Sequence, residues 1–386
     1  MSRMLAPLLV LLFSCSAWAA SARDKAKLIH ERIAGVPPSG SVLTQMENLV
    51  SQGKSVDAAK VAINQASFYN LTLKNWAMPF TNVARSIDLV LNDYVATIIG
   101  MVRDNIPFDQ VLYGDHLYVA SPALVSAGTI PAFSRENNDH YRDLEVRRID
   151  LSNASNLVRV NQSTQTGIVD TAGVITTRAA GSAFFSAGTN RRMFRFLAVN
   201  YLCKDLEALQ DTSLPDTRVR RDVDRSPGGD SRTFKNKCVG CHALQDGVGG
   251  AFAYFNFNDN QTTYDSSRVQ NKYNQNSNVF PDGYRTTDDS WVNFMVSGRN
   301  ASLGWRKPSS GGEYTQGRGA RQLGAALAAT QAFSSCMVER VFTKVCLRPP
   351  TVSEREALES TVRLFETSNY NIKEVFADVP RFCLGT

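Results

Sequence analysis

Residues 236–242 read Asn-Lys-Cys-Val-Gly-Cys-His, and the interpretation of the whole chain starts from this stretch. Two cysteines three positions apart, followed at once by a histidine, form a C-x-x-C-H motif. In this pattern each thiol adds to a vinyl group of one haem, and the imidazole binds the haem iron. The motif therefore predicts one covalently attached haem c, held by Cys238 and Cys241, with His242 as the proximal iron ligand.

Three other uses of the two thiols fit the sequence less well. A zinc site needs a second cysteine or histidine pair at similar spacing, and the sequence contains no other C-x-x-C and no H-x3–5-H. A thioredoxin-like pair follows a buried strand, whereas residues 231–237 do not have the pattern of one. A disulfide between the two cysteines would be local and would constrain little.

The first residues of the chain have the features of a secretory signal peptide. Within residues 1–19, an apolar run at 5–13 follows one arginine, and the segment ends with an A-x-A cleavage pattern at 17–19. Lipid attachment at Cys15 is a minor alternative. No later stretch is apolar for long enough to cross a membrane. We therefore expect a periplasmic or secreted protein with no transmembrane segment in the mature chain, which agrees with haem attachment on the oxidising side of a membrane.

Four further cysteines are an even number in a compartment that permits disulfides. Cys336 and Cys346 are expected on one helix, about 15 Å apart, which is too far to bridge. Each would then pair with Cys203 or Cys383. We favour Cys346–Cys383, because Cys383 lies in a nearby tail.

The second axial ligand of the iron decides what a haem can do. An open position is one possibility, and the protein candidates are His30, His116, His140, Met295, Met337 and the other methionines. His30 and Met337 lie on amphipathic helical patterns, which favours structural roles. Met295 follows His242 at a spacing that suits a haem-binding methionine, although packing would also explain it. His140 lies in polar sequence with no evident core role, so it is the other distal candidate.

Helical periodicity dominates both ends of the chain, so we expect a mostly α, loop-rich protein with a cytochrome c-like haem-binding region. After the signal peptide, residues 20–150 are predicted as a helical N-terminal region and residues 151–386 as the haem-binding region. Apolar spacing and capping signals predict a helix ending at Gly35, helices near 41–53, 55–66, 91–105, 190–209 and 333–345, a helix with a Ser353–Glu356 capping box, and a last helix from Asn371 to Pro380. Residues 121–190 have weak periodicity and are expected to form long loops or an interdomain segment.

Two segments beside the motif have more than one interpretation. The glycine- and aromatic-rich stretch 246–257 would let the backbone approach a flat ligand and supply an apolar wall, or its aromatic residues form core. The arginine-rich stretch 218–232 is interspersed with aspartates, so we expect a mostly solvated loop with one arginine on a haem propionate. The net charge of +6 is modest, and no basic run interleaved with aromatics indicates nucleic-acid binding.

Four stretches together resemble a known group of proteins: 188–192 with the following helix to Cys203, 221–230 before the haem motif, 287–291, and 336–350. They are similar to secreted single-haem cytochrome c-like proteins related to the planctomycete-type cytochromes, mostly uncharacterised. The resemblance covers 188–350 best. It implies an exported haem protein with haem on Cys238, Cys241 and His242, and it implies no catalytic residue. Many members have methionine three residues after the motif histidine, whereas this chain has Gln245, which argues against a shared role for that methionine.

The main hypothesis is a periplasmic single-haem c-type cytochrome that transfers electrons to or from a redox partner protein. The alternative is a haem enzyme of peroxidase or oxygenase type with an open distal site. A third reading is a binding or assembly protein in which the haem is structural.

Overall fold

The computed structural model describes residues 21–186, 188–275 and 279–384. This part of the chain is mostly helical, which confirms the expected mostly α class, and its strands form three separate two-stranded antiparallel sheets. Within these ranges, as expected, no helix is both long and apolar enough to traverse a bilayer. The predicted signal peptide, with Cys15, lies outside the described residues.

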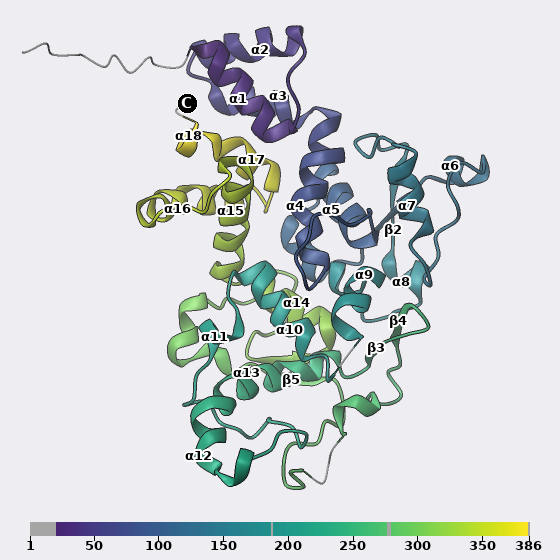
Figure 1. Ribbon diagram of the computed structural model, residues 1–386, viewed down its shortest axis with the longest axis vertical. Coiled ribbons are helices and arrows are strands. Elements are labelled where there is room, and N and C mark those ends of the chain that lie inside the picture. The colour runs from purple at the N-terminus through teal and green to yellow at the C-terminus, as the bar shows by residue number, and fades with distance from the viewer. Residues whose placement is uncertain (1–20, 187, 276–278, 385–386) are drawn as a thin grey trace, which may run out of the picture.

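The two ends of the chain pack together. Helix α1 (Ala22–Ala34) ends at Gly35 as predicted, because this glycine adopts a φ of +76° and its N–H caps the last turn. Helices α2 (Gly40–Ser51) and α3 (Ser55–Ile63) pack on α1. From the other end of the sequence, α17 (Ile372–Asp378) and α18 (Pro380–Cys383) pack on α3. Figure 1 shows these helices at one end of the elongated molecule.

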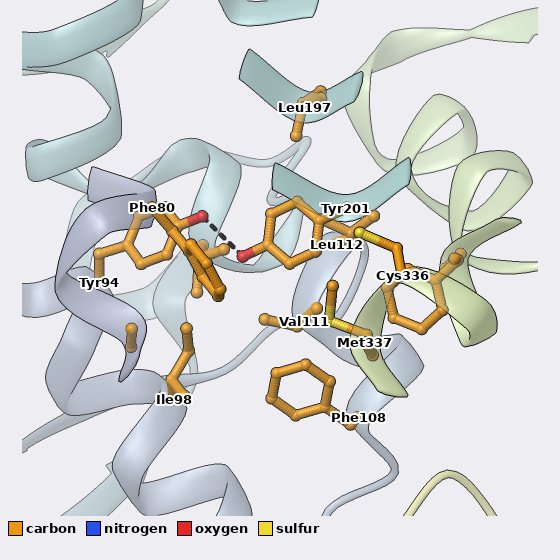
Figure 2. Packing of buried hydrophobic residues seen from close by; sticks show 14 of the residues in the cluster. Phe80, Tyr94, Ile98, Phe108, Val111, Leu112, Leu197, Tyr201, Cys336 and Met337 are labelled. Carbon is orange, nitrogen blue, oxygen red and sulfur yellow. Dashed lines mark hydrogen bonds between the residues drawn. The ribbon is translucent and has the colours of Figure 1, made fainter. Parts of the chain in front are cut away.

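Helix α5 (Asp93–Arg103) lies at the centre of the core, and every residue from 93 to 102 is buried. Its N-cap Asn92 accepts the N–H of Val95. Figure 2 shows how segments far apart in sequence meet here: the Tyr94 hydroxyl on α5 hydrogen-bonds the Tyr201 hydroxyl at 2.6 Å, and Met337 of α15 (Gln331–Cys346) belongs to the same buried cluster. The 91–105 prediction is thus confirmed, and Met337 is a core residue, as expected.

One of the C-terminal helices begins two residues earlier than its predicted capping box implies. Helix α16 (Val352–Thr367) has its capping box at Thr351 and Glu354, two residues before the predicted Ser353 and Glu356. Thr351 is the last residue with extended backbone, whereas Ser353 is already inside the first helical turn. The extended N-cap conformation therefore selects the threonine.

The helix predicted over 190–209 is broken. Helix α10 (Arg191–Leu197) continues into a π-helical turn, 198–202, and ends at Cys203, which adopts a φ of +54°. A separate short helix α11 (Leu206–Leu209) begins after its cap Asp205. The left-handed residue stops the helix although the apolar spacing continues through it.

The remaining elements are short. Residues 121–190, expected to form long loops or an interdomain segment, contain a strand that pairs with residues 117–120 and several short helices. The elements are α4 (Lys74–Ala77), β1 (Leu117–Ala120), α6 (Pro122–Ser126), α7 (Asp139–Val146), β2 (Leu157–Val160), α8 (Gln162–Thr166), α9 (Arg178–Ala180), α12 (Ser231–Thr233), α13 (Val239–Gly249), β3 (Phe255–Asn258), β4 (Gln261–Tyr264), β5 (Ser290–Val292), β6 (Gln316–Arg318) and α14 (Gly319–Ala328).

Two disulfides tie the fold together. Cys203 pairs with Cys336 and Cys346 pairs with Cys383, with Cα–Cα distances of 5.3 and 5.8 Å. Both pairs agree with the favoured pairing, and Cys336 and Cys346 do lie on one helix, α15. The first disulfide joins the end of the α10 segment to α15, and the second joins α15 to the C-terminal helix α18.

Candidate haem-attachment site

The C-x-x-C-H motif lies on the only accessible face of an otherwise buried helix. Of the eleven residues of α13, only Cys241 and His242 are not buried. Cys238, which caps the helix, is also partly exposed. Residues three and four apart share one helical face, so both thiols and the imidazole lie on that face. In Figure 1, α13 lies toward the end of the molecule opposite α1–α3.

The two motif cysteines differ from the other described cysteines. Neither Cys238 nor Cys241 is in a disulfide, whereas the remaining four described cysteines are paired. Burial raises the pKa of the Cys241 thiol, with a further contribution from the nearby Glu207 carboxylate. The Cys241 Sγ lies 3.7 Å from the Leu206 carbonyl oxygen. Two unbridged thiols three residues apart are the donor set that haem attachment requires.

His242 is oriented with one ring nitrogen inward. Its side chain is 25% exposed, but Nδ1 is buried and has no hydrogen bond of ordinary length to any described residue. The exposure therefore belongs to the rest of the ring, which includes Nε2. The Asp246 Oδ2 atom lies 3.5 Å from Nδ1, somewhat beyond the usual 2.7–3.2 Å range. Asp246 is four residues further along α13, on the same side of the helix.

Asp246 belongs to a network of four charged side chains, in which Asp246 and Arg220 are fully buried and Arg191 and Asp222 are partly exposed. Its carboxylate is fully buried and accepts hydrogen bonds from Arg191 Nε at 2.6 Å and Arg191 Nη2 at 2.9 Å. The backbone N–H of Arg220 donates to the same carboxylate at 3.2 Å, and its guanidinium lies 3.7 Å away. Asp222 completes the network by accepting two bonds from Arg191. Two positive and two negative groups balance, as buried charges require.

The arginines decide the charge state of Asp246. Burial by itself raises the pKa of its carboxyl, but the adjacent guanidinium groups of Arg220 and Arg191 outweigh burial and hold that pKa well below its usual range. In return, Asp246 and Asp222 raise the pKa of Arg191, against the effect of its own burial. The carboxylate next to His242 is consequently ionised and fixed in position.

Part of the arginine-rich stretch is buried, although the sequence suggested a mostly solvated loop, and Arg232 is exposed as expected. Arg220 is fully buried with its guanidinium over the ring of Tyr273. Arg225 lies between Phe234 and Phe280, 4.5 and 4.0 Å from the two ring centroids. One of the interspersed aspartates, Asp222, is mostly buried and accepts two hydrogen bonds from Arg191. The expectation is corrected for these residues, and cation–π stacking on distant aromatic rings is the reason.

The glycine-rich stretch after the motif packs against protein. A Cβ at Gly250 would lie 2.0 Å from the Ser290 carbonyl oxygen of β5, and one at Gly249 would lie 2.3 Å from Arg220 Nη2. Phe252 and Phe255 are fully buried against Phe185. The glycines do permit close approach, but to a neighbouring strand and a buried arginine, and these aromatic residues form core.

His140 is not placed as an iron ligand. Its Nδ1 lies 2.7 Å from the Pro131 carbonyl oxygen, and its Nε2 accepts the N–H of Ala120 at 2.8 Å. The ring is neutral, because one nitrogen donates and the other accepts, and burial lowers its pKa. Both nitrogens are engaged with backbone, so the distal prediction for His140 is corrected to a structural role.

Met295 has the buried position that a packing role predicts. It is fully buried, directly after β5, and its backbone oxygen accepts the indole N–H of Trp305. The β5 side of α13 carries Gly247 and Gly250. At about 100° per residue, these positions lie on roughly the opposite side of the helix from Cys241 and His242. The segment that leads to Met295 therefore packs on the side of α13 away from the motif face, and the full burial of Met295 agrees with a packing role.

The residues present fit covalent haem in their chemistry: two unbridged thiols, an imidazole with Nε2 on the accessible side, and a carboxylate behind Nδ1. Among the described residues no group of three or more histidine, cysteine or acidic side chains is arranged to hold a metal ion by itself. Sequence reasoning missed Asp246, although an aspartate four residues after the motif histidine was a usable signal. Comparison of the chain with protein-family models, with curated proteins and with solved structures found no match.

Proposed function

We propose that the chain is an exported single-haem c-type cytochrome that transfers electrons to or from a protein partner. The observation that carries the proposal is the arrangement on α13, where Cys238, Cys241 and His242 share the only accessible face. Thioether bonds to the two cysteines and an axial bond from His242 would place one haem there, and the haem supplies one-electron chemistry. A cofactor at the protein surface suits exchange of electrons between proteins.

Two features support export. Both disulfides use cysteines outside the motif, and disulfides persist in oxidising compartments such as the periplasm. The same compartment is where a leader such as residues 1–19 would deliver the chain. Motif thiols that stay unpaired beside two formed disulfides are consistent with cysteines reserved for another bond.

A haem enzyme of peroxidase or oxygenase type is the second candidate, and one observation favours it. A carboxylate behind a metal-bound imidazole raises the basicity of that ligand, and Asp246 lies in this position. A more basic proximal ligand stabilises oxidised iron, which suits peroxide or oxygen chemistry when the distal position is open.

The proposal is tested by producing the full chain in a host that attaches haem to exported proteins. Mass spectrometry should find one haem on the mature chain, retained after acid–acetone extraction, and none on the Cys238→Ser/Cys241→Ser variant. A wild-type chain that carries no haem refutes the proposal.

Absorption spectra in both oxidation states then separate the two candidates. A low-spin ferric haem that is unchanged by cyanide, carbon monoxide in the reduced state, or peroxide supports the electron carrier. A high-spin haem that binds these ligands readily supports the enzyme.

A further inference from the structure

The charged network behind the motif has a feature that packing alone does not require. Asp246 already has its charge balanced by Arg191 and Arg220, yet one of its oxygens also faces the buried Nδ1 of His242. A buried polar atom without a hydrogen bond is unusual in a folded protein. Asp246 Oδ2 is the acceptor that a small rotation of the His242 side chain would bring into range.

We infer that Asp246 is a positioning residue of the haem site. Its carboxylate accepts a hydrogen bond from the Nδ1–H of His242, which directs the Nε2 lone pair to the iron and lowers the reduction potential of the haem. The inference rests on the proposed haem attachment. A hydrogen bond at one ring nitrogen fixes the tautomer and the ring orientation for the other nitrogen. An acceptor that carries a full negative charge donates more electron density through the ring than a neutral carbonyl would, and this stabilises ferric over ferrous iron.

The two arginines make Asp246 suitable for this task. Arg191 binds both carboxylate oxygens, and the backbone N–H of Arg220 binds Oδ2, so the carboxylate cannot rotate freely. Arg220 is itself held by the Thr189 carbonyl oxygen at 3.0 Å and by the ring of Tyr273. Gly249 leaves the space its guanidinium needs, since a Cβ there would lie 2.3 Å from Nη2. The carboxylate that faces Nδ1 of His242 is therefore held rigidly in place.

The chain offers a matched control in Asp222. Like Asp246, Asp222 accepts two hydrogen bonds from Arg191, at 2.7 and 2.8 Å, but its bonds go to Arg191 and not to His242. Asp222→Asn and Asp246→Asn each remove one negative charge from the same network. A difference between the two variants therefore isolates the contact with the imidazole from the general electrostatic effect.

The test measures reduction potential in the haem-loaded full chain. Asp246→Asn should raise the potential more than Asp222→Asn does, and we expect the extra effect to be at least tenfold in the ferric-to-ferrous equilibrium, which for a one-electron couple is about 59 mV. Equal shifts in the two variants would overturn the inference while leaving the haem attachment intact. A wild-type chain without haem would overturn the proposed function and this inference together.

A second measurement does not depend on the stability of a variant. In the wild-type haem protein, made low-spin with cyanide if needed, proton NMR should show the His242 Nδ1 proton exchanging slowly with solvent, because it is bonded to a buried carboxylate. Rapid exchange of that proton in the wild type would overturn the inference even if Asp246→Asn fails to fold. Asp246→Glu, which keeps the charge, should restore part of the potential.

Discussion

The disulfide between Cys203 and Cys336 should be the more important of the two crosslinks for stability. It closes a segment of 133 residues, against 37 for Cys346–Cys383. If a crosslink acts by restricting the unfolded chain, the loop-closure relation gives about 5 kcal/mol for the longer loop and about 4 kcal/mol for the shorter one. The longer loop also encloses the whole haem motif, so its loss should loosen α13 in particular.

The experiment compares two double variants, Cys203→Ser/Cys336→Ser and Cys346→Ser/Cys383→Ser, in which no orphan thiol remains. Urea unfolding of each exported full chain, followed by circular dichroism, gives the loss in the free energy of unfolding. The two loops do not overlap, so the losses should add when all four cysteines are replaced. In the presence of a reductant, the wild type should approach the variant that lacks both disulfides.

The reasoning would be refuted by a loss below about 2 kcal/mol for Cys203→Ser/Cys336→Ser with its helical content unchanged. A markedly larger loss for the shorter loop would also contradict it, because chain entropy could not then be the main cause.

Three further predictions concern single residues. Gly250→Ala should destabilise the protein by about 1–3 kcal/mol in urea unfolding, because the new Cβ would overlap a carbonyl oxygen of β5. The control Gly40→Ala should be neutral or stabilising, because no atom lies within 4 Å of a Cβ at that position. Equal effects of the two substitutions would contradict the packing of α13 on β5. Burial lowers the pKa of Lys272 to about 8, so between about pH 8 and 10.5 the unfolded chain binds more protons at this side chain than the folded chain does. The free energy of unfolding of the wild type, relative to that of Lys272→Met, should therefore rise with pH over this range. A flat or falling difference between the two proteins would contradict the lowered pKa. His140→Phe should lower the free energy of unfolding by about 1–3 kcal/mol for each backbone group left without a partner, and it should leave the haem absorption spectrum unchanged. An altered spectrum would indicate that His140 is an iron ligand.

Some features of this protein follow from local sequence alone. The C-x-x-C-H motif is complete within five residues, so it predicts haem attachment without a fold. Helices with a capping residue and a clear apolar stripe, such as α1 and α15, were predicted because those signals act within a few turns. Helix geometry excludes a bridge between Cys336 and Cys346, and the nearness of Cys383 in the sequence favours the Cys346–Cys383 pair that the structure contains.

Only the tertiary structure decided what surrounds the motif. Arg191 and Arg220 reach Asp246 from 55 and 26 positions away in sequence, and the aromatic rings over Arg220 and Arg225 come from still other segments. His140 has polar neighbours in sequence, yet it is buried and bonded to two backbone groups. Burial and ion pairing depend on which segments pack together in space, and the local spacing of residues does not indicate which segments those are. The local sequence therefore determined the two thiols and the imidazole of the proposed haem site, and the fold determined the charged groups that pack behind them.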